Sequence, residues 1–115
     1  MNPFLNRSFE QYYRSSPLTV VDVGARGGPH ERWKQCSEYL HLIGFEPDAD
    51  AFRELQAGKA GPGVRTYINA GLLDAPKEVE FHRTRRPGCS SILVPNTELL
   101  KDFPEPQRYD VLSST

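Results

Sequence analysis

The feature that most constrains this chain is an apolar segment, Leu18 to Val23, that runs directly into the glycine-rich turn Gly24-Ala25-Arg26-Gly27-Gly28. Such an apolar run is typical of a central parallel strand that is buried on both faces. Glycine after the strand lets a ligand approach the backbone, because it has no Cβ and adopts positive φ freely. Ligands of open α/β sheets bind at the carboxyl ends of the strands. The pattern therefore predicts an α/β fold with a binding site at this turn.

A second apolar segment, His41 to Phe45, ends in Glu46, eighteen residues after Gly28. A carboxylate at the end of the second strand is placed to accept hydrogen bonds from two ribose hydroxyls, as the acidic residue does in dinucleotide sites. We therefore expect Gly24 and Gly28 to shape the turn and Glu46 to hold a nucleoside. The alternative for Glu46 is a plain surface carboxylate.

The spacing within the turn distinguishes two classes of cofactor. Asp22-x-Gly24-x-x-x-Gly28 lacks the middle glycine of the dinucleotide pattern, because Arg26 stands there. The carboxylate of Asp22 repels a pyrophosphate but suits a ligand that carries a sulfonium and an ammonium group. The pattern thus favours S-adenosylmethionine over a dinucleotide, and a dinucleotide-dependent oxidoreductase is the less favoured enzyme class.

From about Leu18 to about Leu112 the chain resembles the FkbM family of class I S-adenosylmethionine-dependent methyltransferases. The resemblance rests on four motifs: Asp22-Val23-Gly24-Ala25 with Gly28, Gly44-Phe45-Glu46-Pro47, Asn69-Ala70-Gly71-Leu72 and Ser90-Ser91-Ile92-Leu93. It implies a Rossmann-like fold that binds S-adenosyl-L-methionine and methylates a hydroxyl oxygen of a sugar or polyketide-like small molecule. The candidate cofactor-binding residues are Asp22, Gly24, Ala25, Gly28, Glu46 and Asn69.

The chain departs from the family pattern at Arg26, where the family often has asparagine, and at Gly71, where it often has a second small residue. The family continues with a threonine-leucine-aspartate segment and an aspartate-x-glutamate-glycine motif on its fourth strand, and this chain ends at Thr115 before either. We therefore expect the amino-terminal portion of a longer methyltransferase, with an apparently truncated sheet. No Asp, Glu or His has motif support as a general base, so a cofactor-binding but catalytically incomplete fragment is the second hypothesis.

Hydrophobic spacing predicts a β-α-β-α-β unit after an amino-terminal helix. The amino-terminal helix has the apolar stripe Leu5, Phe9, Tyr12 and Tyr13 and ends near Pro17. The three strands are expected from Leu18 to Val23, from His41 to Phe45 and from Val64 to Ile68. The helix after the first strand begins near Pro29 and buries Trp33, Cys36 and Leu40, and the helix after the second is capped by Asp48, carries Phe52 and Leu55, and stops at Gly58. Right-handed crossovers give the strand order 3-2-1. The first strand is then an apolar open edge, through which the chain can self-associate. We expect the amino-terminal helix to pack across the sheet or to cover the site.

After the third strand the signals weaken. Val79 and Phe81 alternate with charged residues as in a half-exposed strand, residues 91–94 and 109–112 are further strand candidates, and residues 97–103 are a candidate for a short helix. The expected division is an amino-terminal helix, residues 1–17, followed by the methyltransferase part, residues 18–115.

Several polar residues have a structural interpretation beside a functional one. Asp22 orients the glycine turn or reaches the cofactor's amino group through water, or it is a turn cap. Asn69 meets the adenine edge or is a plain turn residue. Arg26 contacts the cofactor carboxylate or a substrate, or it is a solvated loop arginine.

Two further groups of side chains carry possible binding roles. The basic cluster Arg83, Arg85 and Arg86 either holds an anionic substrate or forms a solvated turn. The three histidines are dispersed, with no second ligand at helical spacing, so no metal site is predicted.

Composition limits the partners and the compartment. With 14 basic and 15 acidic residues the net charge is −1, so nothing attracts the chain generally to nucleic acid or to an anionic membrane. No apolar run approaches the length of a transmembrane helix, and Met1-Asn2-Pro3-Phe4 does not begin a signal peptide. These features make cytoplasmic residence the default. In that compartment Cys36 and Cys89 are expected to be free thiols rather than a disulfide.

Overall fold

The computed structural model describes residues 6–59 and 61–115 of the chain. Leu5 of the predicted helical stripe and the Met1-Asn2-Pro3-Phe4 segment lie outside these residues. The chain forms two compact units, the first ending at Leu72 and the second beginning at Leu73. The sequence analysis predicted a boundary earlier in the chain, after residue 17. Each unit is described here by itself.

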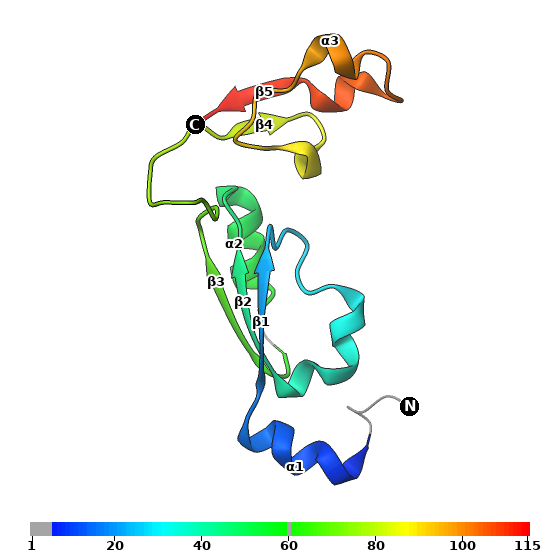
Figure 1. Cartoon of the computed structure of the whole chain (residues 1–115), viewed down its shortest axis with the longest axis vertical. Coiled ribbons are helices and arrows are strands. Elements are labelled where there is room, and N and C mark those ends of the chain that lie inside the picture. Colours follow the sequence, from blue (N-terminus) through cyan, green and yellow to red (C-terminus); the bar gives the residue numbers. More distant parts are fainter. Residues whose placement is uncertain (1–5, 60) are drawn as a thin grey trace. The chain divides into compact units, whose positions relative to one another are not determined.

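The first unit is built on a three-stranded parallel sheet. Its strands are β1 (Leu18–Val23), β2 (Leu40–Phe45) and β3 (Val64–Ile68), in the order β1-β2-β3 (Figure 1). The predicted strand order and the α/β class are confirmed, and the architecture is compatible with a Rossmann-like fold.

The helix after β2 forms as predicted. In α2 (Ala49–Ala57) the N-cap is Asp48, whose Oδ1 accepts hydrogen bonds from the backbone N–H groups of Asp50 and Ala51 at 2.9 and 3.0 Å. The helix ends at Gly58, whose N–H donates to the carbonyl of Glu54. A carboxylate cap and a terminal glycine are strong helix boundaries because they satisfy backbone groups that the helix leaves unpaired.

The segment between β1 and β2 differs from the predicted helix. It is a 3₁₀ helix, η2 (Glu31–Tyr39), with non-helical backbone angles at Cys36. It begins after Pro29, because the ring of His30 caps it by accepting from the N–H of Arg32. Leu40 is not its last buried residue, as the pattern predicted, but the first residue of β2, where it pairs with Leu18. Burial raises the pKa of the Cys36 thiol, and both cysteines of the chain are free.

Both helical segments cover the same face of the sheet. One core cluster joins Leu42 of β2 and Tyr67 of β3 to Leu55 of α2, and a second joins Leu40 to Cys36 and Tyr39 of η2. Val20 of β1 packs against both clusters. We call this side of the sheet the covered face.

The opposite side, here called the open face, carries exposed apolar residues: Val21, Val23, Val64 and Ile68, which are 55, 61, 59 and 40% exposed. The prediction that the strand Leu18–Val23 is buried on both faces is therefore wrong. Its side chains alternate between half-buried and exposed, because η2 and α2 pack on one side only and β1 is an edge strand. The predicted apolar open edge is confirmed.

The amino-terminal helix α1 (Arg7–Ser15) lies at the amino end of β1 (Figure 1). Tyr13 packs against Tyr39, with ring centroids 5.8 Å apart, and Arg14 forms an ion pair with Glu38 at 3.2 Å. These contacts hold α1 against η2. The helix therefore neither crosses the sheet nor covers the carboxyl ends of the strands, contrary to the prediction. No helix in the described part of the chain is long and apolar enough to cross a membrane.

The second unit contains a short antiparallel pair, β4 (His82–Thr84) and β5 (Val111–Ser114). Its other elements are η3 (Pro87–Cys89), α3 (Thr97–Leu100) and η4 (Pro106–Tyr109). The helix predicted over residues 97–103 is shorter than expected.

The strands of this unit lie a few residues beyond their predicted positions, residues 79–81 and 109–112. His82 and Thr84 are buried, whereas Val79 is 41% exposed. The side chains of His82 and Thr84 have hydrogen-bond partners, because Nδ1 of His82 lies 2.8 Å from Oγ of Ser114 and the Thr84 hydroxyl donates to the carbonyl of Arg86. In the predicted strand over residues 91–94, only Ser91 makes a β-bridge, to His82.

Candidate functional site

The glycine turn after β1 adopts backbone angles that only glycine takes without strain. Gly24, Gly27 and Gly28 have φ values of 76, 83 and 84°, in the left-handed region that a Cβ disfavours. The N–H of Gly28 closes the turn by donating to the carbonyl of Ala25 at 3.0 Å. A Cβ built on Gly24 or Gly28 would meet no atom within 4 Å. The backbone of this turn is therefore open to an approaching ligand, as the sequence predicted.

One carbonyl oxygen ties this turn to the end of β2. The N–H groups of Gly24 and Ala25 both donate to the carbonyl of Phe45, each at 2.9 Å. The next residue, Glu46, donates its own N–H to the carbonyl of Ile68 at the end of β3. The glycine turn and the ends of β2 and β3 thus form one hydrogen-bonded cluster.

Glu46 lies in this cluster and is only 4% exposed. Its Oε1 accepts a hydrogen bond from the N–H of Asp48 at 2.9 Å. This bond fixes the Glu-Pro-Asp turn that leads into α2. Glu46 is therefore not a plain surface carboxylate. Each carboxylate oxygen has two acceptor sites, so the group keeps acceptor capacity beyond the turn.

Asn69, the residue after β3, holds the same turn from the other side. Its side-chain amide donates to the carbonyls of Glu46 and Pro47, at 2.8 and 3.2 Å. The structure thus gives Asn69 a turn-fixing role, and its contact with an adenine ring stays a prediction.

Arg26 and Asp48 form an ion pair that sequence reasoning missed. Nη2 of Arg26 lies 3.3 Å from Oδ2 of Asp48, whose side chain is only 2% exposed. Oδ1 of the same carboxylate caps α2. The pair joins the middle of the glycine turn to the start of α2, so Arg26 is not the solvated loop arginine of the structural interpretation. A basic residue in the turn and an acid at the helix cap were the available signals, but nothing in the sequence paired them.

Asp22 and Ala25 differ in what they offer a ligand. Ala25 is 1% exposed and belongs to the core cluster around Leu42; its N–H donates to the carbonyl of Phe45, and its carbonyl accepts from the N–H of Gly28. Asp22 is half-buried and shares the covered face with Tyr67, across Gly44. Within the described chain its carboxylate makes no hydrogen bond, so the capping interpretation finds no support. The predicted cofactor contacts of both residues stay predictions.

Gly44 lets Tyr67 lie over the sheet at this point. A Cβ on Gly44 would come within 2.7 Å of the Tyr67 ring and 2.9 Å of Ala25. Burial raises the pKa of the Tyr67 phenol, Asp22 raises it further, and Arg65 opposes the shift. The glycine of the Gly-Phe-Glu-Pro motif therefore has a packing role that the motif alone did not indicate.

The predicted basic cluster belongs to the second unit. Arg85 pairs with Asp110 at 3.4 Å, while Arg86 belongs to the exposed turn before η3. Arg108 joins the same region, because its carbonyl accepts from the N–H of Arg86 at 3.0 Å and its guanidinium stacks on Tyr109 at 4.7 Å. Among the residues that the structure covers, no three His, Cys, Asp or Glu side chains form a metal-binding group.

Comparison with known proteins adds no identification. No family model, no curated protein and no solved structure matches the chain.

Proposed function

We propose that this chain is the cofactor-binding part of a class I S-adenosylmethionine-dependent methyltransferase that acts on a hydroxyl oxygen of a sugar or another small molecule. The observation that carries the proposal is the shared Phe45 carbonyl, which accepts from both Gly24 and Ala25. It sets a ligand-accessible glycine turn directly beside a buried carboxylate at the next strand end. This is the arrangement that a nucleoside cofactor needs at the carboxyl edge of a parallel sheet.

The residues at the strand ends fit such a cofactor by their chemistry. Glu46 offers acceptor sites for ribose hydroxyls, and the open side of Gly24 offers close backbone approach. Asp22 supplies a negative charge below the turn, which suits a cationic ligand and opposes a pyrophosphate. Asn69 and the Arg26–Asp48 pair hold the surrounding turns in place.

When bound, the cofactor supplies a methyl carbon already activated by its sulfonium. The work left to the protein is mainly to hold the acceptor oxygen in line with that carbon, with a base for the hydroxyl proton. The rigid cluster around Phe45 serves the first task, because three strand ends are fixed relative to one another by backbone hydrogen bonds.

Cofactor binding without turnover is the second candidate. The observation that favours it is the position of β1 at the edge of the sheet. In a complete class I sheet this strand is flanked by a fourth one, whose carboxyl end carries substrate-side residues. The resemblance therefore assigns the acceptor side to a strand beside β1, and in the described residues β1 pairs with β2 alone.

The cofactor test compares S-adenosylhomocysteine with NAD by calorimetry on the full chain and on Glu46→Gln. The glutamine amide keeps one oxygen for the Asp48 N–H but loses a charge-assisted acceptor. Such a bond contributes about 1.5 to 3 kcal/mol, so the affinity for S-adenosylhomocysteine should fall at least tenfold. Glu78→Gln, an exposed glutamate of the second unit, is the matched control and should bind as the parent chain does.

Two results would contradict the proposal: tighter binding of NAD, or equal affinity of the parent chain and Glu46→Gln. Methyl transfer from labelled cofactor to simple sugars separates the two candidates. Turnover by the chain alone rules out the binding-only alternative.

A further inference from the structure

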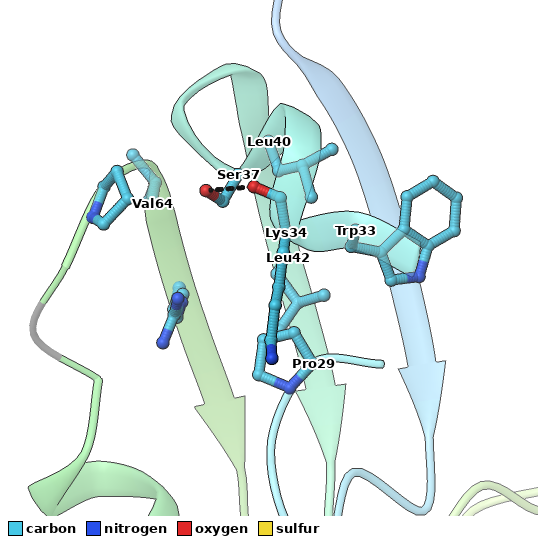
Figure 2. Close-up of a pocket in the computed structure, with 9 residues that line it drawn as sticks. Pro29, Trp33, Lys34, Ser37, Leu40, Leu42 and Val64 are labelled. Atoms are coloured by element: carbon cyan, nitrogen blue, oxygen red, sulfur yellow. Dashed lines mark hydrogen bonds between the residues drawn. The ribbon is translucent and has the colours of Figure 1, made fainter. Parts of the chain in front are cut away.

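A hollow of about 230 Å³ lies on the covered face of the sheet, beside the starts of β2 and β3 rather than their carboxyl ends. It opens between η2 and the starts of β2 and β3. Figure 2 shows Leu40 and Leu42 of β2 and Lys34 and Ser37 of η2 around it, with Val64 and Trp33 on opposite sides. The remaining lining residues are Pro29, Pro62 and Arg65.

The hollow exists because η2 covers its face incompletely. A regular α-helix would lay a continuous stripe of side chains on β2. The 3₁₀ segment instead breaks at Cys36 and turns directly into β2 at Leu40. The result is an apolar floor with prolines at its rim rather than a closed interface.

The charges around the hollow are all positive. None of its lining residues, which all belong to the described chain, carries a carboxylate. The ammonium of Lys34 is paired with Glu31 at 3.1 Å on the exposed side of η2. The half-buried Arg65 is different, because within the described residues its guanidinium has no hydrogen bond or ion pair.

Arg65 also stands where two hollows meet. A second hollow of about 250 Å³ shares Arg65 and Pro29 with the first and continues toward Gly28 and Tyr67. The carboxylate of Glu54 also lines the second hollow, whereas the first has no carboxylate in its lining. The Arg65 guanidinium is therefore the charged group that can turn toward an anion in the first hollow. Its planar fork of donors matches a carboxylate in two parallel hydrogen bonds.

We propose that the hollow beside η2 is a binding site for a small organic anion with one flat apolar ring and a carboxylate, the carboxylate being held by Arg65. The size supports this class of ligand, since a cavity of roughly 150 Å³ holds benzene and the larger space here admits a ring with a short acidic side chain. The apolar floor of Leu40 and Leu42 takes the ring. This site is separate from the strand ends and does not rest on the methyltransferase proposal.

The test is a two-dimensional ¹⁵N NMR titration of the full chain with phenylacetate, without any cofactor. We expect saturable shifts at the amides of Ser37, Leu42 and Arg65, and no shifts at Val21 and Val23 of the open face. Phenylacetamide has nearly the same shape without the charge, and should bind at least tenfold more weakly.

Two variants of Arg65 and one control variant test whether this side chain holds the carboxylate. Arg65→Gln should weaken phenylacetate binding at least tenfold, while Arg53→Gln, an exposed arginine of α2 that pairs with Asp50, should leave it unchanged. Unaltered α2 resonances in Arg65→Gln confirm that it folds, and Arg65→Lys, which keeps the charge but not the planar fork, should bind with intermediate strength.

Three outcomes would overturn the proposal. They are equal affinity for phenylacetate and phenylacetamide, unchanged binding by Arg65→Gln, and shifts that fall on the open face instead of the hollow. Loss of the fold in both Arg65 variants leaves the comparison of the acid with the amide, which decides by itself.

Discussion

On one face of the three-stranded sheet Leu42 is 2% exposed, whereas on the other Val23 is 61% exposed, although both come from apolar strands. The difference arises because the connections from β1 to β2 and from β2 to β3 both run over the same side. Two successive crossovers of the same hand place η2 and α2 together. An apolar strand sequence therefore indicates only that its residues can be buried. The face over which the connecting segments cross decides which of them are buried.

The largest loss in the free energy of unfolding should come from Leu42→Ala, on the covered face. Leu42 is fully buried in a cluster with Leu55 and Tyr67, and removal of such a side chain costs about 2 to 5 kcal/mol. Val21→Ala on the open face, where Val21 is 55% exposed, should change the free energy of unfolding by no more than about 0.5 kcal/mol. Urea denaturation measures both, and similar losses would mean that the open face is covered in solution.

A charge on the open face tests whether that face drives self-association. Edge strands with apolar side chains pair readily with other chains, and lysine on such a strand opposes pairing. We expect the parent chain to associate with rising concentration, and Val21→Lys to remain monomeric with little change in stability. Sedimentation equilibrium reports the difference. A monomeric parent chain would remove the open face as a contact surface, and Thr19→Lys on the same strand and face repeats the test at a second position.

The sequence predicts those parts of the first unit that depend on neighbouring residues. Asp48 and Gly58 mark both ends of α2 because cap chemistry is local, and the glycine turn needs only its own φ angles. The ion pair of Arg26 with Asp48 joins two loops that become neighbours only when the parallel strands align. No local pattern contains that information.

The second unit was harder to predict for a related reason. The burial of His82 and Thr84 depends on hydroxyl and carbonyl partners elsewhere in the unit, so their strand has no apolar alternation to detect. At the candidate site, the positions of Gly24 and Glu46 followed from spacing. The burial of Glu46 and the turn-fixing bonds of Asn69 did not, since they arise from the packing of β2 beside β3.

The smallest effect on the free energy of unfolding should come from ionisation of the Tyr67 phenol on the covered face. Burial raises its pKa in the folded chain, with a further rise from Asp22, whereas an unfolded tyrosine titrates near pH 10, a typical value. Above about pH 10 the unfolded chain loses this proton first. The contribution of Tyr67 to stability is therefore complete below that pH and is lost as the pH rises toward the folded pKa.

Tyr67→Phe keeps the ring over Gly44 but removes the ionising group, so its stability should fall less steeply than that of the parent chain between about pH 9 and 11. Urea midpoints measured across this range give the two slopes. Tyr12→Phe is the matched control, because Tyr12 is 61% exposed on α1, and its slope should follow the parent chain. Parallel slopes for Tyr67→Phe and the parent would mean that the phenol reaches water in the folded state, and that the covered face is looser around Gly44 than its packing indicates.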